Sequence, residues 1–320
     1  MPTIDMSLDK LRVYQGKNPR PADFDEFWDK SLAEMNAIDP NPVFEKADFP
    51  CPIADCYHLT FTSTKGARIY AKFLKPKNIT GKAPALLHFH GLSGASSSWK
   101  SLVSYVTQGL VVASMDCRGQ GGRSEDVGGV AGTTYTTPFM RGLDGKPEDL
   151  YYRDVFLDTA MLARIVMGLD YVDETRVGAT GGSQGGGLTL ACSALVPSIK
   201  LSAPVYPYLS DYRRVWDMDL DKNAYEGLRY YFRHFDPRHE REDAIFERLG
   251  YIDVQYLAPR IKAKVLMATG LLDNICPPST QFAAFNKITA PKKVEIYPDF
   301  GHEHLKGSND LIYSFICENI

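Results

Sequence analysis

The segment of this sequence best equipped for chemistry is a short glycine-rich stretch around one serine. Gly181, Ser183 and Gly185 fit the pattern G-x-S-x-G. A strand-like run ends at Thr180, and an apolar, helix-like segment occupies 188–195. A strand, a sharp turn and a helix are the setting in which this pattern exposes a serine hydroxyl as a nucleophile. Gly181 and Gly185 are expected to support the turn, because glycine lets neighbouring chain segments approach closely.

A glycine-rich turn can also bind a phosphate group, or simply connect a strand to a helix. The glycines here do not follow G-x-G-x-x-G, and no lysine follows them as in a P-loop. We therefore predict that Ser183 is a nucleophile. The backbone N–H of Gln184, at the start of the helix, would then be one donor of an oxyanion hole.

A serine hydroxyl needs an adjacent base before it can attack. Asp273 follows a strand-like run over 264–269, and His302 follows another over 293–297. Serine, acid and histidine in this chain order are typical of α/β-hydrolases. We predict that His302 takes the proton of Ser183 and later returns it to the leaving alcohol. Asp273 would hold the imidazole in the required tautomer.

His304 is the one rival to His302, because it lies two residues away on the same loop. Asp299 is a poor candidate for the orienting acid, since it lies only three residues before His302. The remaining histidines are expected to be structural: His58, His88, His90, His234 and His239.

Two further loops are expected beside the serine. The loop 88–94 follows the third predicted strand, and in this fold that loop donates the second oxyanion N–H. We assign that donor to the backbone of Leu92, against the alternative of an ordinary glycine turn. Arg118 closes the fourth predicted strand, where a bidentate bond to a carboxylate would pin the loop. We interpret Arg118 as structural support and not as a catalytic group.

The elements around these residues alternate between strands and helices. The clearest helix covers 154–169, where apolar residues recur every four positions. A Lys65-Gly66 turn joins the first two predicted strands, which should be antiparallel. The pattern predicts an α/β-hydrolase fold with a doubly wound, mostly parallel sheet. The predicted strands are 57–62, 68–74, 85–90, 110–115, 176–180, 201–205, 264–269 and 293–297.

We expect one α/β-hydrolase domain over residues 1–320. Residues 1–50 look like a helical N-terminal extension, in which Asp23 and Glu26 have the spacing of a capping box. Residues 206–260 show no strand period, and we expect a helical insertion over the active site. The loop 119–151 is long enough to predict a functional or interfacial role.

Composition excludes several other classes. The formal net charge of −3 offers no basic excess for nucleic acid. No apolar run is long enough to span a bilayer, and no polybasic patch suggests binding to a membrane surface. The sequence opens without a secretory signal. We therefore expect a cytoplasmic protein. The six cysteines form no C-x-x-C pair and are expected to be free thiols. No metal or cofactor motif is present in the sequence.

Three signatures in order resemble those of carbohydrate esterase family seven, the acetyl xylan esterases and cephalosporin C deacetylases. They are Arg118-Gly119-Gln120, Gly181-Gly182-Ser183-Gln184-Gly185 and His302-Glu303. Further similar segments, such as 23–28, 172–176, 206–210 and 277–280, extend the resemblance over nearly the whole chain.

The resemblance implies a serine esterase that removes acetyl groups from xylo-oligosaccharides and cephalosporins, with Ser183, Asp273 and His302 as its triad. It also implies backbone oxyanion donors at Leu92 and Gln184, an intracellular location and a doughnut-like homohexamer. This sequence has Leu92 where the family usually has tyrosine, so substrate preference is open although the oxyanion hole should survive. Broad small-ester hydrolysis, lactone hydrolysis and peptidase activity are alternatives on the same fold, and a non-catalytic scaffold is a weaker one.

Overall fold

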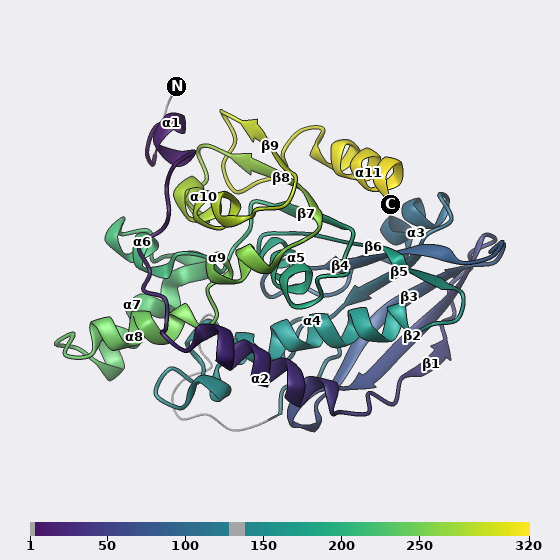
Figure 1. The fold of residues 1–320 in the computed structure, drawn as a ribbon, viewed down its shortest axis with the longest axis horizontal. Helices are drawn as coiled ribbons and strands as arrows, with labels where there is room; N and C mark the ends of the chain where they lie inside the picture. The colour runs from purple at the N-terminus through teal and green to yellow at the C-terminus, as the bar shows by residue number, and fades with distance from the viewer. Residues whose placement is uncertain (1–3, 128–137) are drawn as a thin grey trace.

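A nine-stranded sheet forms the centre of the molecule (Figure 1). The computed structural model describes residues 4–127 and 138–320, so the middle of the predicted loop 119–151 and the first three residues of the extension lie outside the described residues. The strand order is β1-β2-β3-β5-β4-β6-β7-β8-β9. From β5 to β9 along this order all neighbours pair in parallel, whereas β1, β2 and β3 add antiparallel strands at one edge. The predicted doubly wound α/β fold is therefore confirmed.

All eight predicted strands are present, with ends that differ by a few residues. The hairpin between the first two turns at Lys65 and Gly66, which both have positive φ, as the sequence suggests. The strands are β1 Val43–Lys46, β2 Ala54–Thr62, β3 Arg68–Pro76, β4 Ala83–Phe89, β5 Val111–Met115, β6 Val172–Gly182, β7 Leu201–Val205, β8 Lys264–Gly270 and β9 Lys292–Tyr297.

The N-terminal extension is not helical throughout. It contains helices α1 Leu8–Leu11 and α2 Phe24–Asn36, but β1 then joins the sheet as an edge strand. Most β1 side chains are exposed, so its sequence lacks the alternation that predicts a strand. The predicted capping box is also wrong. Asp23 precedes α2, but its carboxylate accepts a hydrogen bond from the hydroxyl of Tyr251 and none from the helix backbone.

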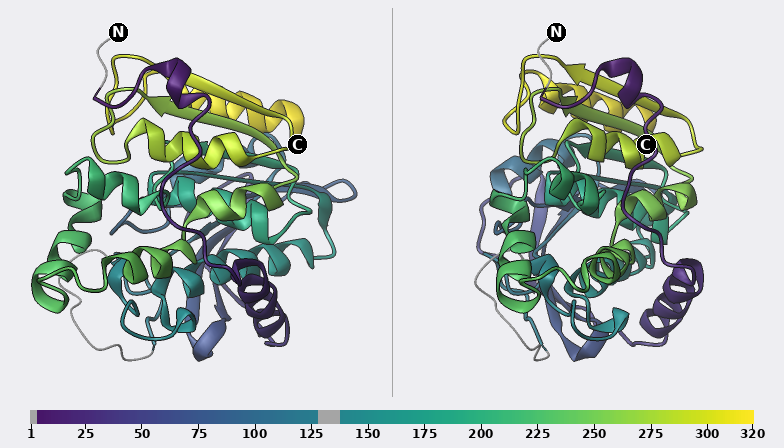
Figure 2. Two further views of the ribbon diagram at one scale, coloured as in Figure 1. Left: turned by 60° about the vertical axis from the view of Figure 1, so that its left-hand side comes forward. Right: turned by 90° about the vertical axis from the view of Figure 1, so that its left-hand side faces the viewer.

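Helices cover both faces of the sheet, and the strand residues alternate between two cores. Leu86 packs in a core with α3 Trp99–Val106 and α11 Ser308–Asn319. Its neighbour Leu87 packs in the larger core. That core contains α4 Tyr151–Met167, α5 Gln184–Leu195 and α10 Pro278–Lys287. The ribbon views show these two layers on opposite sides of the sheet (Figures 1 and 2).

The segment 206–260 between β7 and β8 contains only helices and turns, which form the left-hand part of the molecule in Figure 1. Its first residues lie at the carboxyl end of β7, and α9 packs against α5 and α10. The short helices η2 Pro138–Met140 and η3 Pro147–Asp149 precede α4, and η1 Thr64–Gly66 lies in the β2–β3 turn. The insertion contains α6 Tyr212–Asp217, η4 Asn223–Tyr225, α7 Glu226–Phe235, α8 Glu242–Gly250, α9 Val254–Leu257 and η5 Ala258–Arg260.

Two buried carboxyl groups tie the N-terminal segment to this insertion. Asp211 accepts hydrogen bonds from the backbone N–H groups of Lys17 and Asn18, at 2.9 and 2.8 Å, and from the Tyr14 hydroxyl. The backbone N–H of Asp211 donates in turn to Asp253 at 2.9 Å. Burial, and then the charge of Asp211, raise the pKa of Asp253 to about 7.

This raised pKa predicts a pH-dependent stability. An aspartate in an unfolded chain has a pKa of about 3.9, so between about pH 4 and pH 7 the folded state binds the Asp253 proton more tightly than the unfolded state does. The folded state therefore loses stability as pH rises through this window. We expect the unfolding free energy of the wild type, minus that of Asp253→Asn, to fall from pH 4 to pH 7 in urea titrations. The same difference for Asp243→Asn, at a fully exposed carboxylate, should show no such fall. A difference for Asp253→Asn that stays constant with pH would contradict the assignment.

Candidate active site

Ser183 stands on a sharp turn between β6 and α5. Its φ and ψ angles are 57° and −120°, a conformation that a residue with a side chain seldom adopts. The turn depends on the two flanking glycines. A Cβ atom on Gly185 would lie 2.2 Å from the carbonyl oxygen of Phe89, and one on Gly181 would lie 2.5 Å from that same oxygen. The glycines are required because the end of β4 fills the space where side chains would be.

The serine, histidine and aspartate that the sequence singles out lie in one hydrogen-bonded chain. His302 Nε2 is 2.9 Å from Ser183 Oγ, and His302 Nδ1 is 2.8 Å from Asp273 Oδ2. Asp273 is fully buried, whereas the side chain of His302 is 18% exposed. A hydroxyl, an imidazole and a carboxylate in this geometry can deprotonate the hydroxyl and stabilise the resulting imidazolium.

Close packing of two strand ends brings Asp273 and His302 together. A Cβ on Gly270, the last residue of β8, would lie 2.3 Å from the carbonyl oxygen of Phe300. The loops after β8 and β9 can therefore touch. Asp273 Oδ1 then accepts backbone hydrogen bonds from Ile275 and Cys276, at 2.9 and 2.8 Å. These bonds hold the carboxylate toward the imidazole.

His304 and Asp299 do not take part in this chain. Both side chains are exposed. Within the described residues, His304 makes no hydrogen bond to the protein, whereas His302 makes two. The geometry therefore favours His302 over its rival.

The backbone N–H groups of Leu92 and Gln184 have the properties expected of oxyanion donors. Within 4–127 and 138–320, neither N–H donates a hydrogen bond to a protein acceptor. Gln184 begins α5, where the helix dipole adds partial positive charge. The loop that carries Leu92 runs beside the serine turn, since a Cβ on Gly91 would lie 3.9 Å from the carbonyl oxygen of Gly182.

Gln120 joins these two donors through side-chain hydrogen bonds. Its Oε1 accepts from the backbone N–H of Ser93, one residue after Leu92, at 2.8 Å. Its Nε2 donates to Oε1 of Gln184 at 2.8 Å. Gln120 was recognised in the sequence only as part of a family signature. Its role depends on contacts between distant segments, which no local pattern reveals.

Arg118 lies beneath this loop and is almost fully buried. Its guanidinium donates two bonds to Asp158 of α4, from Nε at 2.6 Å and from Nη2 at 2.7 Å. Nη2 also donates to Thr64 in the turn before β3. The bidentate pair anchors the start of the loop that presents Gln120. Arg118 donates to Asp158 and Thr64 and makes no bond to the serine hydroxyl within the described residues.

The structure adds two residues to the site that were not predicted individually. The ring of Tyr206 packs against the ring of His302 with a centroid distance of 4.7 Å. The thiol of Cys276 is fully buried, and the backbone N–H of Cys276 donates to Asp273 at 2.8 Å. Burial, and then the charge of Asp273, raise the pKa of the Tyr206 hydroxyl and of the Cys276 thiol. Both groups are therefore neutral, which leaves Asp273 as the negative charge beside His302.

Two features of the described part of the chain concern metal binding and membrane insertion. No group of three or more His, Cys, Asp or Glu side chains there is arranged to hold a metal ion. No helix there is long and apolar enough to cross a membrane.

The strand–turn–helix presentation of Ser183, on a sheet of this order, defines the α/β-hydrolase class. The comparisons with known proteins are more specific. The family described as Acetyl xylan esterase (AXE1) matches residues 1–319. The chain therefore belongs to the acetyl xylan esterase family, a family of carboxylic ester hydrolases.

Solved structures and a curated relative agree with this membership. The crystal structure of acetyl xylan esterase 1 from Thermoanaerobacterium sp. JW/SL YS485 superposes with a TM-score of 0.96 at 54% identity, covering 98% of this chain and 99% of that one. The acetyl xylan esterase from Paenibacillus sp. R4 has a TM-score of 0.93 at 33% identity, covering 98% and 100%. Acetyl esterase Axe7A of Xylanibacter ruminicola is 29% identical over 302 residues, which are 92% of this chain. The chain spans 66% of the length of that relative.

The bridging position of Gln120 yields a prediction. Gln120→Ala should loosen the Leu92 loop and Gln184 together, and a small misplacement of donors lowers the rate of a chemical step by up to ~10²-fold. We expect kcat for p-nitrophenyl acetate to fall while KM changes little. Gln108→Ala, at an exposed glutamine after α3, is the matched control and should behave as the wild type. An unchanged kcat in Gln120→Ala would show that the bridge has no part in the reaction.

Proposed function

We propose that this protein is a serine esterase that removes acetyl groups from small substrates such as acetylated xylo-oligosaccharides and cephalosporin C. The observation that carries the proposal is the hydrogen-bonded chain from Ser183 through His302 to the buried Asp273. Membership of the acetyl xylan esterase family supports the ester and the acetyl group as the target.

The proposed reaction has two halves, formation of an acetyl-serine and its hydrolysis, and both use the triad and the two backbone donors. Ser183 Oγ attacks the acetyl carbonyl carbon while His302 Nε2 takes the hydroxyl proton. The oxyanion of the tetrahedral intermediate accepts hydrogen bonds from the N–H groups of Leu92 and Gln184. His302 then protonates the leaving alcohol, and an acetyl-serine remains. Water, deprotonated by His302, then attacks the acyl carbon; the bond to Ser183 Oγ breaks, acetate leaves, and His302 returns the proton to Oγ. Asp273 orients the imidazole throughout.

The individual substrates, the location in the cell and the oligomeric state rest on resemblance and stay predictions. The names of two solved relatives support acetylated xylan fragments as substrates, and that of Axe7A supports an acetyl ester. Cephalosporin C comes from the family resemblance alone. Leu92 replaces the family tyrosine beside the carbonyl, and the smaller polar surface there is expected to alter substrate preference. The cytoplasmic location and the homohexamer are likewise predictions from the resemblance.

Acetate release tests the nucleophile and the substrate class in one experiment. We expect the wild type to release acetate from acetylated xylo-oligosaccharides and cephalosporin C, and Ser183→Ala to release almost none while its melting temperature stays unchanged. His302→Ala should lose nearly as much, because the triad acts as a unit. His234→Ala removes an exposed imidazole from α7 and serves as the control with full activity.

Three results would redirect or overturn the proposal. Cleavage of p-nitrophenyl acetate without acetate release from acetylated xylo-oligosaccharides or cephalosporin C would leave an esterase and remove the sugar assignment. Preferred turnover of long-chain esters, lactones or aminoacyl amides would favour broad carboxylesterase, lactone hydrolase or peptidase chemistry. Residual activity in Ser183→Ala equal to that of the wild type would remove the proposed nucleophile.

A further inference from the structure

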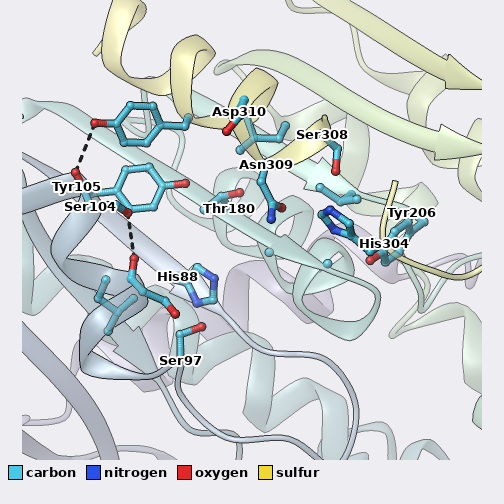
Figure 3. A pocket seen from close by; sticks show the side chains of 17 residues that line it. His88, Ser97, Ser104, Tyr105, Thr180, Tyr206, His304, Ser308, Asn309 and Asp310 are labelled. Atoms are coloured by element: carbon cyan, nitrogen blue, oxygen red, sulfur yellow. Dashed lines mark hydrogen bonds between the residues drawn. The ribbon is translucent and has the colours of Figure 1, made fainter. Parts of the chain in front are cut away.

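A cavity of about 490 Å³ lies between α3 and α11, at the carboxyl ends of β4 and β6 (Figure 3). Small-molecule sites usually measure ~300–1,000 Å³, so the cavity is of a suitable size for a ligand. His88 of β4 and Thr180 of β6 lie on the sheet side of the cavity. Tyr105 comes from α3, and Asn309 comes from α11.

Polar side chains enter the lining of the cavity at a place where the fold could have extended a hydrophobic core, and Leu102, Val205 and Ile312 line it as well. Leu86 lies on the same face of β4 and packs with the apolar residues of α3 and α11. Two residues further along, the strand period places His88 on that face instead. In Figure 3, His88 and Ser97 point toward the middle of the cavity from one side and Asn309 from the other. Polar groups therefore interrupt the apolar packing of this layer where the strands approach Ser183.

The cavity shares residues with the surroundings of the serine. Gly182 lines it and directly precedes Ser183. Tyr206 lines it as well, and the same ring packs against His302 at 4.7 Å. An ester with its carbonyl carbon at Ser183 Oγ needs space nearby for its alcohol portion, and Gly182 and Tyr206 place the cavity next to the serine and the histidine. The cavity supplies such space.

The lining suits a neutral ligand that is rich in hydroxyl groups. Among the described residues around the cavity there is one carboxylate, Asp310, and neither lysine nor arginine. Burial, and then the nearby His90, lower the pKa of His88 to about 4, so its imidazole is neutral. Its Nδ1 is 3.2 Å from Ser114 Oγ, which leaves Nε2 to donate to a ligand or accept from it. The amide of Asn309 can do the same. Tyr105 and Tyr313, with centroids 5.3 Å apart, add ring faces and hydroxyl groups.

We infer that the cavity between α3 and α11 is the subsite that binds the xylose units of the substrate while the acetyl group lies at Ser183. The inference rests on the proposed function, because it names where the sugar of that substrate binds. It also predicts a preference, since a lining with a carboxylate and no cation favours neutral xylo-oligosaccharides over the anionic cephalosporin C.

The test compares two substrates in variants of Asn309. Asn309→Ala removes one hydrogen-bonding group, which corresponds to roughly a two- to tenfold weaker binding, and Asn309→Trp fills the cavity. We expect KM for acetylated xylotriose to rise in Asn309→Ala and to rise further in Asn309→Trp. The kcat/KM for p-nitrophenyl acetate, which carries no sugar, should change by a smaller factor than that for acetylated xylotriose in both variants. Asn319→Ala, at the far end of α11, is the matched control and should change neither value.

A binding measurement separates this inference from the proposed function. Ser183→Ala should bind unacetylated xylotriose in a calorimetric titration, and Ser183→Ala with Asn309→Trp should not. Unchanged KM values in both Asn309 variants, or equal binding with and without Asn309→Trp, would overturn the subsite. If the wild type cleaves p-nitrophenyl acetate but no acetylated xylotriose, the substrate assignment fails. The calorimetric result then decides the subsite independently.

Discussion

The carbonyl oxygen of Phe89 lies so close to Gly181 and Gly185 that neither position has room for a Cβ atom. This contact between the end of β4 and the turn after β6 forces the backbone of Ser183 into its positive-φ conformation. Such strain costs of order 1–3 kcal/mol and persists only where surrounding structure holds it. Here β7 and the insertion hold it, because Ser183 N donates to Val205 O and its carbonyl accepts from Tyr208 N, both at 3.0 Å. The hydroxyl is therefore presented by a rigid part of the sheet.

The remaining parts of the site are arranged around that fixed point by the carboxyl ends of the neighbouring strands. The end of β4 supplies the Leu92 loop, and the ends of β8 and β9 supply Asp273 and His302. Through its hydrogen bond to Ser93, Gln120 connects the loop after β5 to the Leu92 loop. Because parallel strands end at one edge, four separate loops reach one serine without any long-range distortion of the sheet. At the same edge, polar side chains interrupt the apolar layer under α3 and α11 and, with Leu102 and Ile312, line the cavity near the serine.

Local patterns were sufficient to predict most of this arrangement. Buried parallel strands give continuous apolar runs, so eight strands and their order along the chain could be predicted, as could the turn at Ser183 and the loops that carry Asp273 and His302. Features that depend on contacts between distant segments could not be predicted from the sequence. The exposed strand β1 has no apolar pattern, and Asp23 turned out to bond Tyr251 instead of capping α2. Tyr206 belongs to the family-like segment 206–210 and Cys276 to no motif, and both join the site only when the chain folds.

Covalent labelling of Ser183 is the most direct test of the claim that His302 activates a uniquely placed serine. The protein would be treated with diethyl p-nitrophenyl phosphate, which phosphorylates activated hydroxyl groups, and its peptides analysed by mass spectrometry. We expect one modified residue, Ser183, in the wild type and very slow modification of Ser183 in His302→Ala. Modification of another residue, or labelling of Ser183 at the same rate without His302, would contradict it.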